Sequence, residues 1–166
     1  LMGGEAGAES QPGAGSTFLI YLPEVTSAAD ALPPSSPDAS PGGHETVLLA
    51  EDDEMVRHNV SGVLRGAGYR VLEAKDGQDA VGLHSRNVGS IDLIVVDAVM
   101  PRKSGLQVYR EISARDARVR VLFTSGYSRD VFPEEFFASG KHDLIAKPYS
   151  PEALLAAVRA ALTRAG

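Results

Sequence analysis

Short apolar runs alternate with segments of helical spacing over most of this chain, from Glu45 to Gly166. Near-continuous apolar strands that alternate with amphipathic helices are typical of a parallel sheet covered on both faces. Right-handed crossovers leave few topologies for a domain of this size. We therefore predict an α/β fold with a doubly wound, five-stranded parallel sheet, whose strands lie at residues 47–50, 69–72, 93–96, 119–123 and 144–146.

The segments between these strands carry apolar stripes that predict helices. The first helix is expected to end at Gly68, because glycine often closes a helix C-terminus. The last should begin with Ser150 as its N-cap and Pro151 at its first helical position. A shorter helix is predicted over residues 134–138. The stripes comprise Val56, Val60, Val63, Leu64 and Ala67 in the first helix, Leu106, Tyr109 and Ile112 in the third, and Leu154, Val158 and Leu162 in the last.

Composition divides the chain into three parts. Residues 23–44 are dominated by proline, serine and alanine and show no periodic apolar face, which is typical of a linker. Residues 1–22 form a short piece before it, and residues 45–166 form the α/β domain. Because the chain starts at Leu1 within a glycine-rich pattern, we expect it to be a fragment of a longer protein.

Charge and composition exclude several classes of function. The formal net charge of -6 argues against a surface for nucleic acid or an anionic membrane, because both need basic patches. The absence of cysteine excludes disulfides and thiolate zinc sites, and it fits a reducing, cytoplasmic compartment. No apolar run approaches the roughly 20 residues of a membrane span.

Polar residues follow several of the predicted strands. Acids follow the first strand as Glu51-Asp52-Asp53, and Asp97 ends the third. Ser125 comes near the end of the fourth strand, and Lys147 follows the fifth. In doubly wound sheets the functional site lies beyond the carboxyl ends of the strands, so these groups should converge there. Taken singly, each is also typical of a helix start or a solvated turn.

The convergence itself points to phosphoryl chemistry. Two carboxylates about 4 Å apart repel by about 4 kcal/mol at an effective dielectric near 20, so the acids need a cation. Oxygen ligands that retain waters suit Mg²⁺. Beside the metal, Asp97 would be the nucleophile, while Lys147 and Ser125 would contact the oxygens of an incoming phosphoryl group.

Four motifs, VLLAEDDEMVR, DAVMPRKSG, VLFTSGY and IAKPYSP, resemble the receiver domain of two-component response regulators over about residues 45–165. The resemblance implies a flavodoxin-like fold in a phosphorelay, with a histidine kinase or phosphotransfer domain as donor. It places the phosphoacceptor on Asp97 and the switch hydroxyl on Ser125 rather than Thr124. It also implies a cis bond between Lys147 and Pro148.

The same resemblance implies the ligands of the magnesium ion. Asp52 and Asp97 would bind it through carboxylates, Val99 through its backbone carbonyl and Glu51 through water. Asp53 is the commonly acidic neighbour of the acid pair.

The stretch MGGEAGAESQPGAGSTFLIYLPE resembles the last hairpin of the ATP-binding domain in sensor histidine kinases. Together with the linker, it suggests the carboxyl end of a hybrid histidine kinase. The motifs of the ATP site and the phosphodonor histidine are absent from these residues, so only self-phosphorylation and dephosphorylation are expected. The four histidines, His44, His58, His84 and His142, are predicted to be solvated surface residues.

Other readings remain open beside the receiver. A docking module that has lost phosphorylation would keep the same fold. A haloacid-dehalogenase-type hydrolase would need an acid at Val99, and a P-loop nucleotidase would need GxxxxGK[ST], which is absent.

One position departs from the family pattern. In receivers an aromatic switch residue lies three positions before the lysine, and here that position is Leu144. Tyr127 or Phe132 could take over part of the role. We therefore expect a modest switch, with the last helix and the preceding strand as the partner face.

Overall fold

The computed structural model describes residues 5–11, 13, 15–21, 43–126, 132 and 142–164. The chain separates into two compact units, residues 1–38 and residues 39–166. The predicted helix over residues 134–138 and the side chain of Tyr127 lie outside the described residues. Within the described part of the chain, no helix combines the length and the apolar character that a membrane crossing requires.

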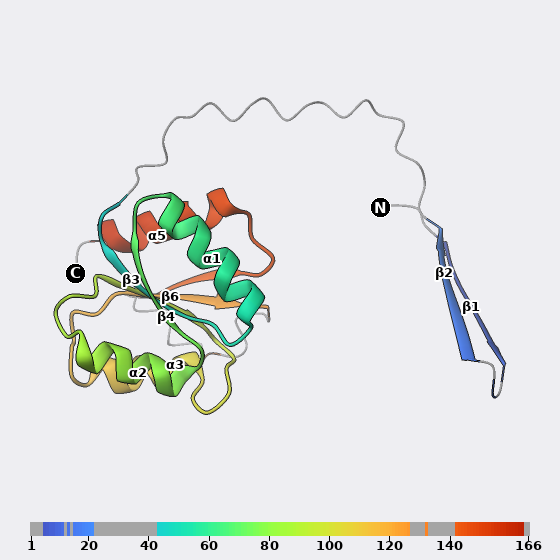
Figure 1. Cartoon of the computed structure of the whole chain (residues 1–166), viewed down its shortest axis with the longest axis horizontal. Helices are drawn as coiled ribbons and strands as arrows, with labels where there is room; N and C mark the ends of the chain where they lie inside the picture. The colour runs from blue at the N-terminus through green and yellow to red at the C-terminus, as the bar shows by residue number, and fades with distance from the viewer. Residues whose placement is uncertain are drawn as a thin grey trace, which may run out of the picture. The chain divides into compact units, whose positions relative to one another are not determined.

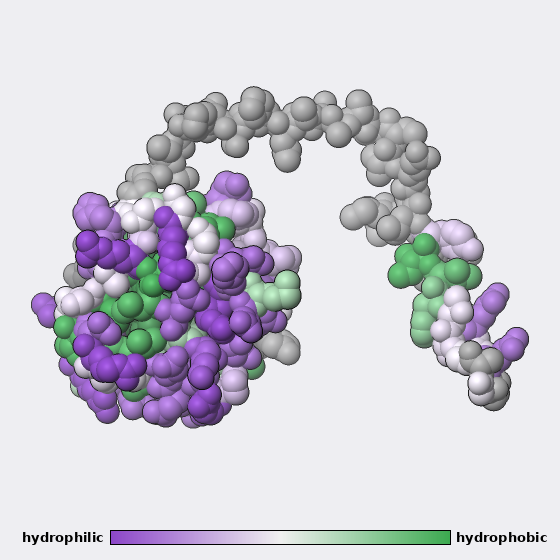
Figure 2. Space-filling model, in the orientation of Figure 1, coloured by the Kyte–Doolittle hydropathy of each residue, from purple (hydrophilic) through white to green (hydrophobic). Residues whose placement is uncertain are grey.

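The first unit contains an antiparallel hairpin of β1 (Glu5–Gln11) and β2 (Gly15–Tyr21). Its register pairs Ser10 with Ser16, whose hydroxyls lie 2.8 Å apart. The hydrophobic residues of β2 form the green surface of the hairpin in Figure 2, and Phe18 and Ile20 are 75% and 72% exposed. The predicted hairpin is therefore present, with apolar side chains on its surface.

The second unit contains a parallel sheet of five strands in the order β4-β3-β5-β6-β7. Connections run outward from β3 in opposite directions, so the strand order reverses between β3 and β5. This arrangement confirms the predicted doubly wound fold. The strands are β3 (Thr46–Ala50), β4 (Arg70–Ala74), β5 (Leu93–Asp97), β6 (Val121–Ser125) and β7 (Asp143–Ala146).

Helices cover both faces of this sheet, as Figure 1 shows. On one face α1 (Glu54–Gly66) and α5 (Pro151–Thr163) pack over a core that includes Leu64 and Val158. On the other face α2 (Gly77–Arg86) and α3 (Gly105–Ser113) pack over a core centred on Phe123. Because both faces are covered, the central strand β5 is apolar along Leu93–Val96 and becomes polar only at Asp97.

The helix ends follow the capping residues of the sequence. Ser150 caps α5 by accepting from the Ala153 N–H, and Pro151 is its first residue, as predicted. Gly68 adopts a φ of 93° directly after α1, a conformation that glycine adopts without strain. Asp53 caps α1 by accepting from the N–H groups of Met55 and Val56. This acid next to the predicted acid pair therefore has a structural task.

The strand that carries the predicted switch hydroxyl begins two residues later than expected. We predicted residues 119–123, whereas β6 spans Val121–Ser125. Thr124 pairs with Asp97 on β5, and Ser125 pairs with Ala146 on β7. Ser125 is thus part of the sheet and 1% exposed, not in a loop after it.

The chain enters the sheet at the amino end of β3, where Gly43 is fixed. Its N–H donates to the Ala67 carbonyl at 3.1 Å. A Cβ at this position would lie within 2.4 Å of the side chains of Glu45, Tyr69 and Arg159. Arg159 donates to Glu45 and to the Tyr69 hydroxyl, both at 2.7 Å, so the crowding around Gly43 comes from a bonded cluster.

The prediction that all four histidines are solvated is wrong for His84. His44 and His58 are exposed, and His142 is half-buried with its ring 4.5 Å from the ring of Tyr109. His84 is only 2% exposed, on the inner face of α2. It lies 3.9 Å from the Asp116 carboxylate. Burial lowers the pKa of His84, and the attraction of Asp116 only partly opposes this shift.

We expect this buried imidazole to make folding stability sensitive to acid. The unfolded chain binds a proton at His84 near the ordinary pKa, whereas the folded chain resists it, so stability falls as the pH falls through that value. Urea denaturation at about pH 7.5 and about pH 5.5 should show a smaller loss in His84→Gln than in the wild type. The exposed His58→Gln variant should keep the wild-type loss. An equal loss in the wild type and both variants would contradict the prediction.

Candidate functional site

Three acids meet at the carboxyl edge of the sheet. Glu51 and Asp52 directly follow β3, and Asp97 ends the neighbouring strand β5. Carboxylate oxygens of the three residues lie within 4.8 Å of one another. Glu51 is 3% exposed, Asp97 is half-buried and Asp52 faces solvent. The reversal of strand order therefore gathers these carboxylates in one place, where the sequence predicted them.

Lys147 reaches this group from the end of β7. Its ammonium nitrogen lies 2.7 Å from Glu51 Oε2 and 2.7 Å from Asp97 Oδ2. Burial works against the ammonium, yet its hydrogen bonds to Asp97 and Glu51 outweigh burial and raise the pKa of Lys147. Lys147 is therefore charged and neutralises two acids. Sequence reasoning assigned this lysine only to a phosphoryl group and missed its bond to Glu51.

Glu51 is the acid that solvent reaches least. Burial raises the pKa of Glu51, and its hydrogen bond with Lys147 opposes the shift only partly. Asp52 and Asp97 are more accessible. This difference in accessibility fits a site where Asp52 and Asp97 contact a ligand directly and the buried Glu51 does not.

The donor set of this pocket suits a hard cation. The acidic group offers carboxylate oxygens as ligand atoms, and Mg²⁺ prefers oxygen ligands. The exposed Val99 follows Asp97 by two residues, and its N–H points back to Asp97 Oδ1 at 3.3 Å. The residues expected to hold a magnesium ion are thus compatible with it in chemistry.

The loop after Asp97 is held against the rest of the domain. A Cβ at Gly105 would lie 2.4 Å from the Asp97 carbonyl oxygen, so only glycine lets α3 start this close to β5. Arg102 adopts a left-handed φ of 66°, and its guanidinium forms an ion pair with Asp76, the buried N-cap of α2. Lys103 forms an ion pair with Glu111 on α3. These contacts fix the segment that carries Val99.

The residues around the expected switch position are well packed. Leu144 is half-buried and contacts the core that contains Phe123. Phe132 is 6% exposed, with its ring 4.9 Å from the ring of Phe123. Tyr109 lies edge-on to Phe123 at 6.2 Å. Leu144 therefore pairs with Phe123 in the sheet and belongs to the same core as these aromatic rings.

Two further features lie next to Lys147. The bond between Lys147 and Pro148 is cis, as the resemblance implied. Burial raises the pKa of Tyr149, and the neighbouring Thr124 opposes this shift only weakly. Sequence reasoning missed Tyr149, and its spacing two residues after the lysine gave no signal of its burial beside the site.

Comparison with known proteins agrees with this geometry. The model of the response regulator receiver domain family matches residues 47–159. The sensor kinase CckA of Brucella abortus (strain 2308) is 32% identical over 170 residues, which cover 98% of this chain and 18% of that kinase. Response regulator RR06 of Streptococcus pneumoniae serotype 2 is 33% identical over 118 residues, covering 71% of this chain and 53% of that protein. This chain thus spans about half of the length of response regulator RR06 and less than a fifth of the length of CckA.

Solved structures show the same fold. The receiver domain of the hybrid histidine kinase CckA has a TM-score of 0.61 and 30% identity, covering 71% of this chain and 99% of that structure. The BeF3-activated receiver domain of DrrB has a TM-score of 0.61 and 27% identity, covering 74% of this chain and all of that structure (100%).

Proposed function

This chain belongs to the response regulator receiver domain family, and from that premise we propose that Asp97 accepts a phosphoryl group from a phosphohistidine donor. The observation that carries the proposal is the position of Asp97, whose Oδ2 lies 2.7 Å from Lys147 Nζ beside Glu51 and Asp52. A carboxylate at a rigid strand end, next to the ammonium of a lysine, suits transfer of a phosphoryl group.

In the proposed reaction an oxygen of Asp97 forms a bond to phosphorus while the bond from phosphorus to the donor nitrogen breaks. The leaving imidazole keeps the electron pair of that bond. Lys147 can move its contact from the Asp97 carboxylate to the oxygens of the phosphoryl group, because its side chain is long and flexible. Ser125, buried on the adjacent strand β6, would hydrogen-bond one of those oxygens.

A magnesium ion is part of this proposal. Asp52 and Asp97 would hold it through carboxylates and Val99 through its carbonyl, with Glu51 acting through water. When bound, it would neutralise charge on the transferred group. An acidic group of this kind is typical of receivers that bind Mg²⁺.

We further propose that the chain is the carboxyl end of a hybrid histidine kinase, with residues 1–22 from its ATP-binding domain and residues 23–44 as linker. The similarity to CckA extends over 98% of this chain, so it includes the hairpin. The hairpin exposes apolar residues on both faces, with Phe18 and Ile20 on one and Leu19 and Tyr21 on the other. An isolated two-stranded hairpin is marginal in water, so further strands of a parent sheet would cover it.

The partners would be a phosphodonor histidine kinase or phosphotransfer domain. Receiver domains interact with such kinases and with output partners. We propose that phosphorylation changes a surface formed by α5 and β7, because β7 leads directly into Lys147 and α5 begins four residues later.

Exposure to acetyl phosphate with Mg²⁺, followed by intact-mass measurement, tests the proposed function. We expect a single phosphoryl adduct that chelation of the metal with EDTA prevents. A chain shortened to begin at Gly43 should form the same adduct, because all proposed site residues lie after it. Failure of the shortened chain alone would contradict the division of the chain. No adduct on either chain would favour a docking module, and repeated release of phosphate would favour a hydrolase.

A further inference from the structure

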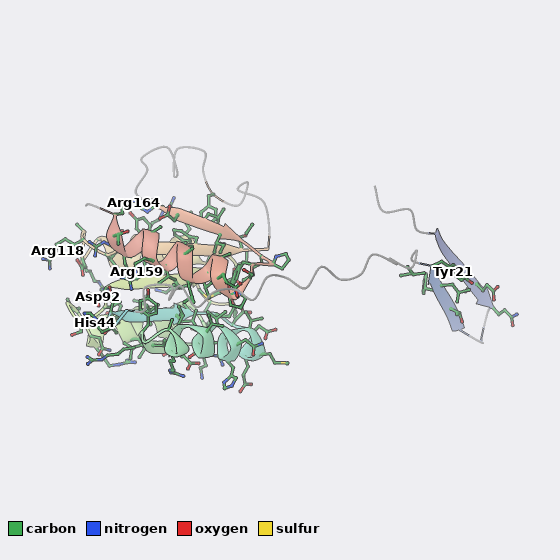
Figure 3. The ribbon with its side chains drawn as sticks, turned by 90° about the horizontal axis from the view of Figure 1, so that it is seen from above. Tyr21, His44, Asp92, Arg118, Arg159 and Arg164 are labelled. Carbon is green, nitrogen blue, oxygen red and sulfur yellow. The ribbon has the colours of Figure 1, made fainter. Side chains whose placement is uncertain are left out.

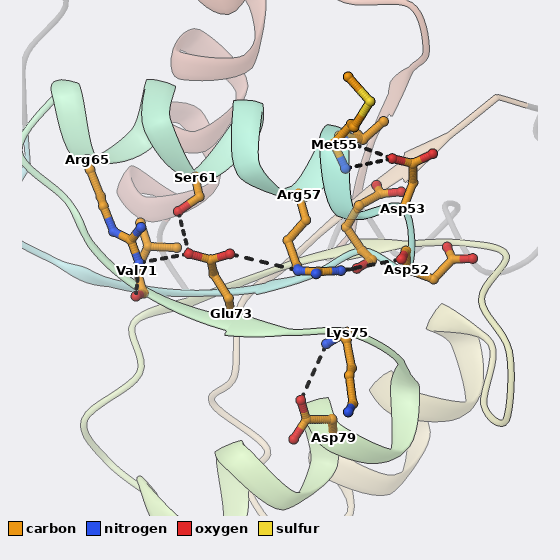
Figure 4. A network of polar contacts seen from close by, with 12 residues as sticks. Asp52, Asp53, Met55, Arg57, Ser61, Arg65, Val71, Glu73, Lys75 and Asp79 are labelled. Atoms are coloured by element: carbon orange, nitrogen blue, oxygen red, sulfur yellow. Dashed lines mark hydrogen bonds and ion pairs between the residues drawn. The ribbon is translucent and has the colours of Figure 1, made fainter.

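Arg57, on the first turns of α1, contacts the backbone of the acid pair. Its Nη1 donates to the Glu51 carbonyl at 2.8 Å and to the Asp52 carbonyl at 3.3 Å. Figure 4 shows the guanidinium of Arg57 between Asp52 and the carboxylate of Glu73. The side chain of Arg57 is only 16% exposed, unlike a solvated arginine on a helix surface.

Glu73, on the edge strand β4, holds the other side of this guanidinium. Its Oε2 lies 3.8 Å from Arg57 Nε. Its Oε1 accepts from the Ser61 hydroxyl at 2.9 Å and lies 2.9 Å from Arg65 Nη2. Glu73 is therefore fixed from α1 at several points (Figure 4). The orientation of Arg57 follows from a network and not from one exposed ion pair.

The acid pair lies where regular sheet hydrogen bonding stops. The Glu51 N–H still donates to the Ala74 carbonyl at 3.2 Å, as in the sheet. After it, Asp53 already serves as the N-cap of α1. The two carbonyls between these points are the ones that Arg57 binds. The guanidinium thus holds the turn that carries Glu51 and Asp52, and this turn directs their carboxylates into the pocket.

We propose that Arg57 is the positioning residue of the magnesium site, acting through the carbonyls of Glu51 and Asp52 and held in place by Glu73. The inference rests on the proposed function, because it concerns the same acids. Groups that orient metal ligands without touching the metal typically change metal affinity by about 10–100-fold when they are replaced.

Two effects of Arg57 on metal binding have opposite signs. Its positive charge near the acids disfavours a cation, so loss of charge alone would tighten Mg²⁺ binding. The hydrogen bonds from its Nη1 to both carbonyls fix the acids, so their loss would weaken Mg²⁺ binding. Arg57→Lys separates these effects, because lysine keeps the charge but loses the planar guanidinium. Its single nitrogen cannot lie beside Glu73 and also be held rigidly against the two carbonyls, as Nε and Nη1 of Arg57 are.

The test is a calorimetric titration of Mg²⁺ into the full chain, without any phosphodonor. We expect Arg57→Lys to weaken Mg²⁺ binding by about 10-fold or more. The matched control is Arg70→Lys, the same change in an exposed arginine at the amino end of β4, remote from Glu51 and Asp52. This control should bind Mg²⁺ like the wild type, and both variants should show similar melting temperatures.

A second readout needs no metal. The carbonyl ¹³C resonances of Glu51 and Asp52 should shift in Arg57→Lys and stay in place in Arg70→Lys. Wild-type Mg²⁺ affinity in Arg57→Lys, or equal weakening in both variants, would overturn the positioning role alone. A wild-type chain that binds no Mg²⁺ would overturn the proposed function and this inference together.

Discussion

Asp97→Asn should abolish the phosphoryl adduct while the domain stays folded. The amide keeps the shape of the side chain and can still accept a hydrogen bond from Lys147, but it lacks the nucleophilic carboxylate. In the presence of acetyl phosphate and Mg²⁺, intact mass should show only unmodified protein, and the circular dichroism spectrum should match the wild type.

Asp92 provides a matched control at the other end of the same strand. It precedes β5, and its carboxylate accepts from the Thr46 N–H at 2.8 Å. Asp92→Asn makes the same chemical change in an exposed acid remote from the carboxyl edge, so its adduct should form as in the wild type. Uptake by Asp97→Asn at the wild-type rate would show that another residue accepts the phosphoryl group.

Lys147→Met should slow phosphorylation from acetyl phosphate by about 10²–10³-fold, the typical effect of removing one group that stabilises charge in a transition state. The same variant should bind Mg²⁺ more tightly than the wild type. In the structure the ammonium contacts Glu51 and Asp97, so it competes with a metal for their charge. Slower chemistry together with tighter metal binding would distinguish this role from simple disruption of the pocket.

Stability gives an independent measurement on this variant. Without Lys147, the buried Glu51 loses its charged partner, so the metal-free domain should melt at a lower temperature. Added Mg²⁺ should then raise the melting temperature more than in the wild type, because a ligand that binds only the folded state stabilises it. Lys75→Met, an exposed lysine that follows β4 at the same sheet edge, is the control. Wild-type phosphorylation rate and Mg²⁺ affinity in Lys147→Met would contradict the assignment.

The sheet and the convergence of the acids could be predicted because they depend on local pattern and on a general property of parallel strands. Apolar runs identify strands such as Leu93–Val96, and carboxyl ends of neighbouring parallel strands meet at one edge. This is enough to bring Asp97 close to Glu51 and Asp52. The start of β6 was placed too early because Val119 is apolar and lies just before the strand, where periodicity does not mark a boundary.

The burial of His84 could have been predicted from its helix. Ala80 and Val81, four and three residues earlier, are both buried, so His84 continues their stripe. The contacts of Arg57, Arg102 and Lys147 had no such signal. Each depends on the direction that a long side chain takes and on the backbone or side-chain group that it meets, which spacing along the chain does not describe.

The fixed position of Gly43 has a practical consequence for experiments in which this domain is immobilised or labelled. His44, Asp92 and Arg118 lie together at one end of the domain in Figure 3. Gly43 directly precedes His44 in the sequence, and Asp97 ends the strand that Asp92 precedes, so Asp97 lies at the other end of β5. A sensor chip, bead or fluorescent reporter coupled at Gly43 would therefore attach at the end of the sheet where β3 begins. The edge that carries Asp97 lies at the other end of the strands, so attachment at Gly43 would leave it accessible to soluble partners.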